Sequence, residues 1–173
     1  MTETRVANAA IDVLESTPGT LRALLSGLPE DAVTARGPEG WSAKDIVAHL
    51  ASLEQPAMFD RVGLLAAGGD PEVPNIDEEA VLRDFGLWDA PLGTLLDAFA
   101  KRRAEAVAWL RTLTPEQLAN SGRHSYAGRI TAAEQVNHFA YHDLAHIRQT
   151  CNLLIPPIDA MRGAMGEAFP DSG

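Results

Sequence analysis

Cysteine, basic clusters and long apolar runs are all scarce in this chain, and each scarcity excludes a class of protein. Cys151 is the only cysteine, so an intramolecular disulfide is excluded. No apolar run approaches the roughly 18–20 residues that a membrane span requires, and one of the longest, VGLLAA, ends at Gly68-Gly69. The N-terminal segment MTETRVANAAIDVLES lacks the basic-then-apolar order of a secretory signal, so we expect a cytoplasmic protein.

Positive charge is also in short supply. The chain has 24 acidic and 14 basic residues, which give a net charge of −10. Proteins that bind nucleic acid by neutralising its phosphates usually carry a basic patch. The one compact basic run, Lys101-Arg102-Arg103, lies in a predicted helix and is interpreted as a solvated face. We therefore expect a small-molecule substrate, no nucleic-acid partner and no membrane, with a homodimer left open.

Helical spacing dominates what is present. The 173 residues suffice for one domain with a sizeable core, and no segment alternates convincingly as a strand does. The predicted long helices span about 6–28, with a kink or restart at Thr17-Pro18; 42–68, with a bend at Pro56; 94–113; and Thr131 to about Cys151.

Capping signals and breakers organise the connections. Ser42 and Thr131 each open a capping box, and Thr114-Pro115 starts a short helix. Loops are expected at 29–40 and at 120–130. A third, long loop is expected from the end of the second long helix to Pro91, with one short helix near 78–85. Pro156-Pro157 should stop the final helix. The pattern predicts an all-α, antiparallel four-helix bundle over 1–155 with a short extra helix in a connection, followed by a tail over 156–173.

Three of the five histidines form a stripe in the last predicted helix, at His138, His142 and His146. Residues four apart lie on nearly the same helix face, with Cβ atoms about 5–6 Å apart, so two neighbouring imidazoles can bind one divalent ion. His138 and His146 cannot share an ion, because eight residues span roughly 12 Å. Helical phase leaves His138–His142 and His142–His146 both open, and a solvated polar face is the competing interpretation.

A third ligand has to come from another helix. Metal sites in bundles use inward side chains of facing helices, and the second predicted helix offers His49 between Ile46, Leu50 and Leu53. A lone histidine there is more often a hydrogen-bonded core residue, but the stripe supplies partners for it. Three neutral imidazoles with one open position describe a catalytic type of divalent metal site.

Two segments carry a resemblance to a known family: WSAKDIVAHL, which contains His49, and HDLAHIRQ, which runs from His142 to Gln149. With Thr131 between them, they make the chain resemble the DinB-like family of four-helix-bundle metal-binding proteins from about Val6 to Cys151. Many relatives have glycine where Arg148 stands, a difference that leaves the histidines intact.

The resemblance implies a ligand set and a range of activities. The ligands are His49, His142 and His146, with His138 one turn above the site. Similar proteins include thiol S-transferases and isomerases that use low-molecular-weight thiols such as mycothiol or bacillithiol. A divalent metal lowers the pKa of a bound thiol or water, which produces a nucleophile at neutral pH.

We therefore expect a metal-dependent thiol S-transferase. Zinc is the first choice of metal, with nickel or iron as alternatives. A metal-dependent hydrolase and a metal-binding protein without turnover are the alternative functions. Acidic residues within 70–79 could border the cleft and disfavour strongly anionic substrates.

The remaining candidates have simpler explanations. Asp45 precedes His49 by four residues and could orient its ring, although a capping role explains it equally well, and Glu134 stands likewise to His138. Tyr141 and Asp143 flank a ligand but point away in helical phase. His124 lies in a loop that could reach the mouth of the site. Cys151 has no basic sequence neighbour that would activate it as a nucleophile.

Overall fold

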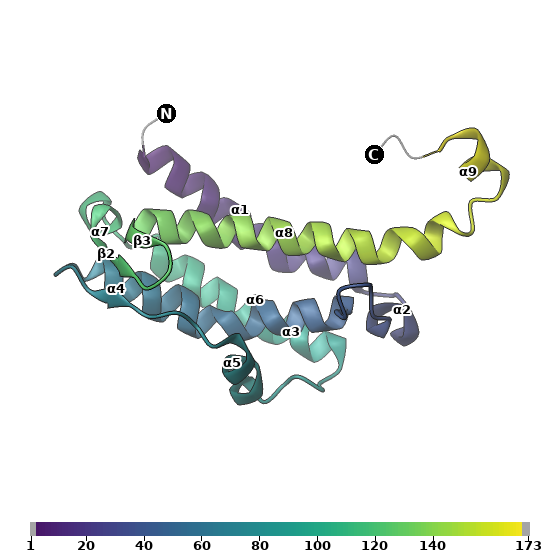
Figure 1. Cartoon of the computed structure of the whole chain (residues 1–173), viewed down its shortest axis with the longest axis horizontal. Coiled ribbons are helices and arrows are strands. Elements are labelled where there is room, and N and C mark those ends of the chain that lie inside the picture. The colour runs from purple at the N-terminus through teal and green to yellow at the C-terminus, as the bar shows by residue number, and fades with distance from the viewer. Residues whose placement is uncertain (1–2, 171–173) are drawn as a thin grey trace.

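The computed structural model describes residues 3–170 as a bundle of helices with a small sheet at one end (Figure 1). Residues 1–2 and 171–173, which belong to the predicted bundle and tail, lie outside the described residues. The long helical segments are α1 (Glu3–Leu25), α3 (Ala43–Leu53) with its continuations η1 (Glu54–Val62) and α4 (Gly63–Ala66), α6 (Leu92–Leu110) and α8 (Ala132–Asp159). The short elements are α2 (Glu30–Thr34), β1 (Glu72–Val73), α5 (Glu78–Phe85), α7 (Pro115–Ala119), β2 (Ser121–His124), β3 (Gly128–Thr131) and α9 (Ala164–Ala168).

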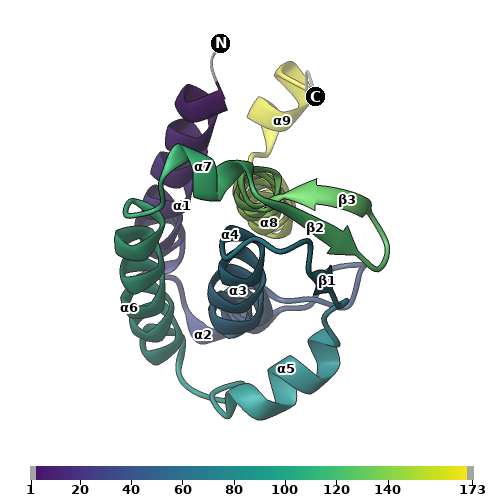
Figure 2. The same cartoon turned by 90° about the vertical axis from the view of Figure 1, so that its left-hand side faces the viewer.

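The long segments form the predicted four-helix bundle, in which α1 and α3 each pack on both α6 and α8 (Figure 2). α1 and α8 run in one direction and α3 and α6 in the other, so the antiparallel pairs are α1–α6 and α3–α8 (Figure 1). Two ion pairs agree with the opposite directions of α1 and α6. Arg22, near the end of α1, pairs with Asp97 near the start of α6, and Glu15, earlier in α1, pairs with Arg111 just after the end of α6. Because α3 and α6 are parallel neighbours, the chain must return between them, and the predicted short helix α5 lies in that connection.

The helix starts follow the capping signals. The Ser42 hydroxyl accepts a hydrogen bond from the Asp45 amide, and the Asp45 carboxylate accepts one from the Ser42 amide. Thr131 and Glu134 make the same reciprocal pair at the start of α8. Each box satisfies amide groups that a helix N-terminus leaves without an intrahelical partner. These local contacts place His49 and the histidine stripe at defined positions along their helices.

The predicted kink or restart at Thr17-Pro18 is not a restart, because α1 runs through Pro18 without interruption. Proline has no amide hydrogen, so the carbonyl of Leu14 lacks its usual partner four residues later. Arg103 of α6 fills that role, with its Nη1 donating to the Leu14 carbonyl at 2.8 Å. A tertiary hydrogen bond thus compensates the local defect.

The interpretation of Lys101-Arg102-Arg103 as a solvated face is wrong for Arg103, which is 2% exposed. Its guanidinium donates to Glu54 through Nε at 2.9 Å and Nη2 at 2.6 Å, and it also forms an ion pair with Asp143. With the Leu14 carbonyl, these partners come from α1, η1 and α8. One side chain of α6 therefore connects all four long helical segments.

The other predicted proline positions lie within helical segments, and one of those predictions is wrong. Pro56 lies in η1, a π-helical segment whose wider turns accommodate a residue without an amide donor. Pro156 and Pro157 do not stop the last helix, because α8 continues to Asp159. The carbonyls that the two prolines leave free are those of Asn152, which is exposed, and Leu153, which is half-buried, so water can reach this part of the helix.

The predicted loop at 120–130 is instead a hairpin. β2 pairs antiparallel with β3, and β1 adds in parallel to β2, which makes a three-stranded sheet. Gly122 permits this pairing, because a Cβ there would lie 2.5 Å from the carbonyl oxygen of Pro71. The hairpin covers the first turns of α8, next to His138.

Apolar side chains of the four long segments fill the interior in two clusters. One surrounds Leu14, Met58 and Leu110, and the other surrounds Leu25, Ile46 and Phe99. No helix among residues 3–170 is both long enough and apolar enough to cross a membrane.

Candidate metal centre

Three histidines from two helices meet inside the bundle. His49 of α3 is buried, whereas His142 and His146 of α8 are half-buried. The Nε2 atom of His142 lies 3.3 Å from Nε2 of His49 and 3.2 Å from Nε2 of His146. Of the two pairs that helical phase left open, the structure brings His142 and His146 to His49. His138 is exposed and does not belong to the cluster.

The spacing of these nitrogen atoms fits a single divalent ion. Four ligands arranged tetrahedrally at the usual Zn–N distance of about 2.0–2.1 Å lie about 3.3–3.4 Å from one another. Two of the separations in the cluster, 3.3 and 3.2 Å, are close to that value, and one ligand atom from each histidine lies within 4.8 Å of the others. The donor set is three imidazoles, which suits zinc, nickel, copper and iron.

The ring of His146 is held by a chain of polar contacts. Its Nδ1 donates to Oε1 of Gln149 at 2.8 Å, and Nε2 of Gln149 donates to Glu39 at 2.8 Å. An amide oxygen only accepts, so Nδ1 carries the proton and Nε2 presents its lone pair to the cluster. Trp41 stacks on His146 at 6.2 Å between centroids and meets His49 edge-on at 5.0 Å.

The other two rings have no such support. Nδ1 of His49 and Nδ1 of His142 are buried, and neither has a hydrogen-bond partner in the described part of the chain. A structural core histidine normally satisfies its ring nitrogens with hydrogen bonds. Here the polar contacts of both rings are with the other histidines, an arrangement that a shared cation explains.

Burial keeps the cluster neutral. It lowers the pKa of His49 to about 4, with the charge of His146 adding to the effect. The pKa of His142 falls to about 3, mainly through burial and then through His146 and His49. Burial also lowers the pKa of His146, against the opposing hydrogen bond to Gln149. Neutral imidazole is the form that binds metal, so the rings are ready for ligation at neutral pH.

These pKa values predict acid sensitivity of the metal-free protein. A histidine in the unfolded chain titrates near 6.5, whereas His49 and His142 titrate at about 4 and about 3 in the folded one. Between those values the unfolded chain binds more protons, so the free energy of unfolding should fall as pH falls from 6.5 to 4. Urea unfolding with a chelator present, repeated at several pH values, measures the free energy of unfolding. The dependence of this free energy on pH should be weaker in His142→Gln than in the wild type. An equal slope in His142→Gln and wild type would contradict the assignment, and exposed His138→Gln is the matched control.

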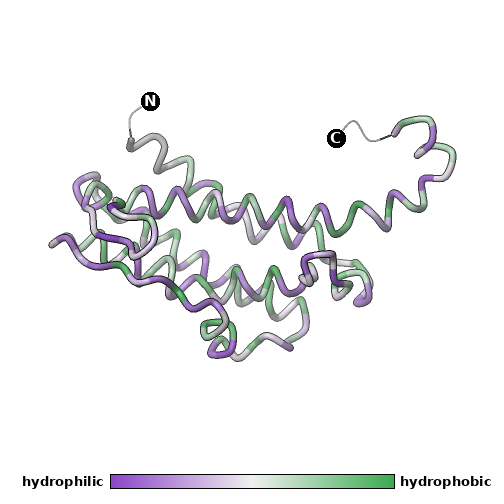
Figure 3. Tube along the Cα trace, viewed as in Figure 1, coloured by the Kyte–Doolittle hydropathy of each residue, from purple (hydrophilic) through white to green (hydrophobic). Residues whose placement is uncertain are grey.

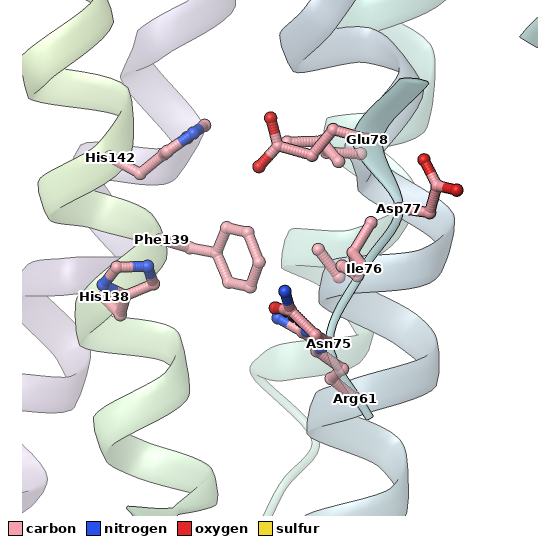
Figure 4. Close-up of a pocket in the computed structure, with 10 residues that line it drawn as sticks. Arg61, Asn75, Ile76, Asp77, Glu78, His138, Phe139 and His142 are labelled. Atoms are coloured by element: carbon pink, nitrogen blue, oxygen red, sulfur yellow. Dashed lines mark hydrogen bonds between the residues drawn. The ribbon is translucent and has the colours of Figure 1, made fainter. Parts of the chain in front are cut away.

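A cavity of about 330 Å³ opens beside the cluster. Figure 4 shows His142, His138 and Phe139 of α8 on one side of it and Arg61, Asn75 and Glu78 on the other. The Glu78 carboxylate points across the cavity toward His142, whereas the Asp77 carboxylate points away. Glu78 is the first residue of the short helix α5 and lies more than sixty residues from His142, so nothing in the sequence singled it out beyond the acidic character of 70–79.

The other candidate residues from the sequence lie outside the three-histidine cluster. Asp45 and Glu134 serve as capping residues, and Tyr141 is exposed. Asp143 is fully buried against Arg103 and does not belong to the cluster. His124 lines a second cavity of about 450 Å³, which shares Arg61, Asn75, Glu78 and His138 with the first. Cys151 is half-buried.

Comparison with known proteins places the chain in a family. A protein of Oceanobacillus iheyensis named “Putative metal-dependent hydrolase” is 29% identical over 141 residues, which cover 78% of this chain and 79% of that protein. YfiT from Bacillus subtilis, described as a probable metal-dependent hydrolase with an unusual four-helix bundle topology, superposes with a TM-score of 0.74 at 23% identity over 85% of each chain. The model of the DinB superfamily matches residues 14–150, so the chain belongs to the DinB superfamily.

Proposed function

We propose that this protein is a metal-dependent hydrolase in which His49, His142 and His146 hold one divalent ion, with zinc as the first candidate and nickel or iron as alternatives. The observation that carries the proposal is the position of Glu78, whose carboxylate faces the same cavity as His142 (Figure 4). Two proteins that are similar to this chain are named or described as metal-dependent hydrolases, which is consistent with it.

Each residue around the site would have a separate role in hydrolysis. A divalent ion at such a site supplies Lewis acidity, which brings the pKa of water or a thiol toward neutrality and polarises a substrate oxygen. Glu78 would accept the proton that the attacking group loses and return it to the leaving group. Arg61, on the same wall, would bind a polar group of the substrate, and Phe139 and Trp41 would limit the access of bulk water.

Glu78→Gln tests this assignment. Loss of a general base typically reduces turnover by about 10²–10⁴-fold, and glutamine keeps the shape of the side chain. We expect such a loss of ester or amide hydrolysis by the metal-loaded protein, with metal content unchanged. Asp77→Asn is the matched control, because Asp77 also lines the cavity but its carboxylate points away from it, and asparagine also caps a helix well. Full hydrolysis by Glu78→Gln would remove Glu78 from the mechanism.

A thiol S-transferase remains the second candidate, and the second cavity favours it. The two adjoining cavities, of about 330 and 450 Å³, give room for a thiol and an electrophile together. In that reaction the Glu78 carboxylate would take the thiol proton as the sulfur attacks the electrophile. The same assays separate the two functions: hydrolysis needs no thiol, whereas a transferase consumes an electrophile only when mycothiol, bacillithiol or glutathione is added.

A further inference from the structure

The second cavity, of about 450 Å³, contains polar groups to which the proposed hydrolysis assigns no role. It adjoins the first cavity, with which it shares Arg61, Asn75, Glu78 and His138. Its other walls are the β2–β3 hairpin and the first turn of α8. We call this second cavity the hairpin compartment. A substrate held at the metal centre can extend into it.

Gln135 is a buried polar residue that lines the hairpin compartment. It is 4% exposed, and among residues 3–170 its side-chain amide has no hydrogen-bond partner. Amide groups that are this deeply buried normally form hydrogen bonds. Gln135 precedes His138 and His142 by three and seven residues, so the three side chains lie on one face of α8. The Gln135 amide is therefore available to a polar group of a ligand in the compartment.

Arg61 supplies a positive charge where the two cavities join, and with Asn75 it lies opposite His138 (Figure 4). Its Nε and Nη2 donate to the Pro74 carbonyl at 3.1 and 2.6 Å, which fixes the orientation of the guanidinium. Among the described residues, Nη1 has no hydrogen-bond partner and the guanidinium has no ion pair. A guanidinium binds carboxylates well, because its donors match the two carboxylate oxygens.

His124 supplies a neutral donor to the same compartment. Its Nδ1 accepts hydrogen bonds from the amides of Tyr126 and Ala127, both at 3.1 Å. Burial lowers the pKa of His124, and the charges of Arg61 and His138 lower it further, so the ring is neutral at pH 7. A neutral imidazole with an accepting Nδ1 carries its proton on Nε2. The Nε2–H group is therefore the part of the ring that can donate to a ligand.

The charges around the compartment favour a ligand with a single negative charge. Arg61 is the fixed positive charge of its described lining, and the carboxylates of Glu78 and Glu134 also border it. Glu134 is engaged in the capping box, where its Oε2 accepts from the Thr131 amide at 2.7 Å and from the Thr131 hydroxyl at 3.0 Å. A dianion such as phosphate would be repelled by two carboxylates with one guanidinium to offset them. A carboxylate carries one charge and accepts from all three donors.

Apolar side chains separate these donors from the metal centre. Phe139 points across the first cavity toward Ile76 (Figure 4). Along α8, the seven residues from Gln135 to His142 span roughly 10 Å. A hydrocarbon segment of several methylene groups matches both this distance and the apolar walls.

We propose that the hairpin compartment binds a carboxylate of the substrate through Arg61, His124 and Gln135, while the scissile bond lies at the metal centre. The substrate class is an ester or amide in which an apolar segment joins the scissile group to a terminal carboxylate. This inference rests on the proposed hydrolase and names its substrate. The acidic residues of 70–79 are compatible with one carboxylate, because the Asp77 carboxylate points away from the cavity.

Binding to the metal-free protein tests the compartment without turnover. In proton–nitrogen NMR spectra, hexanoate should cause saturable shifts of the Gln135 side-chain amide and the His124 ring, whereas hexanamide should not. Arg61→Gln should weaken hexanoate binding about 10–100-fold, as expected for loss of a hydrogen bond to a charged group. Arg123→Gln is the matched control, because Arg123 is exposed on β2 and lines neither cavity. Unchanged binding in Arg61→Gln, or larger shifts with inorganic phosphate, would overturn the carboxylate assignment.

Turnover by the metal-loaded protein tests the substrate class. Mono-para-nitrophenyl suberate carries its carboxylate on the acyl side of the ester, and ω-acetoxyoctanoate carries it on the alcohol side. For at least one of them, kcat/KM should exceed that of the matching primary amide by about 10–100-fold. His124→Asn should reduce this preference, because asparagine keeps an acceptor for the two turn amides but lacks the Nε2 donor.

The outcomes separate this inference from the proposed hydrolase. Equal kcat/KM for acid and amide on both sides of the ester would overturn the substrate class while leaving the hydrolase in place. Hydrolysis of none of these compounds would count against the hydrolase, and the hexanoate titration would still show whether the compartment binds a carboxylate.

Discussion

The His142→Ala variant is expected to purify without stoichiometric metal, whereas His138→Ala keeps it. His142 lies between the other two histidines, with its Nε2 at 3.3 Å from His49 and 3.2 Å from His146. Loss of an outer hydrogen-bonding partner of a ligand typically costs about 10–100-fold in metal affinity. Removal of the central ligand should cost more than that, and elemental analysis with competition by a chromophoric chelator measures both quantities.

Comparison with His138→Ala distinguishes loss of a metal ligand from a general effect on α8. His138 is one helical turn from His142 and lines the same cavity, but it lies outside the cluster. A general disturbance of α8 would affect both variants alike. Equal metal loss in both, in variants that unfold at the same urea concentration as the wild type, would show that the ligand pair is His138–His142. Full metal content in His49→Ala would show that the third ligand is not from α3. Either result would contradict the centre described above.

The features that the sequence predicted well are those that depend on neighbouring residues. Helical period located the four long segments, and the capping boxes at Ser42 and Thr131 are hydrogen-bonded as the sequence indicated. The same period placed His142 and His146 one turn apart on one face. Choosing that pair over His138–His142 required either the family resemblance or the position of α3, because helical phase is equal for both.

The features that the sequence did not reveal depend on residues far apart in the chain. Pro18 is tolerated in α1 because Arg103, far along the chain, donates to the Leu14 carbonyl. The strands β2 and β3 are four residues each and carry no alternating apolar pattern, so no local signal distinguishes them from a loop. Glu78 gains its position only when α5 folds against α3, which brings the Glu78 carboxylate to the cavity.

Arg103→Met is expected to destabilise the metal-free protein by about 3–5 kcal/mol, because it leaves Glu54 and Asp143 buried without their cation. Both carboxylates are at most 3% exposed, and both form an ion pair with Arg103. Methionine retains most of the apolar stem, so the loss reports charge rather than volume. Lys101→Met is the matched control, because Lys101 is exposed on the same helix, and it should change the free energy of unfolding little.

Acid should partly rescue Arg103→Met, and this distinguishes an uncompensated charge from a packing defect. Burial raises the pKa of Glu54 even in the wild type, where Arg103 opposes the rise, so removal of Arg103 must raise it further. A carboxyl whose pKa is higher in the folded than in the unfolded state loses stability as pH rises through the folded value. The difference in unfolding free energy between wild type and Arg103→Met should therefore shrink as pH is lowered toward 5, and adding Glu54→Gln should restore part of the loss at neutral pH. A difference that is independent of pH and unaffected by Glu54→Gln would indicate that Arg103 acts through packing alone.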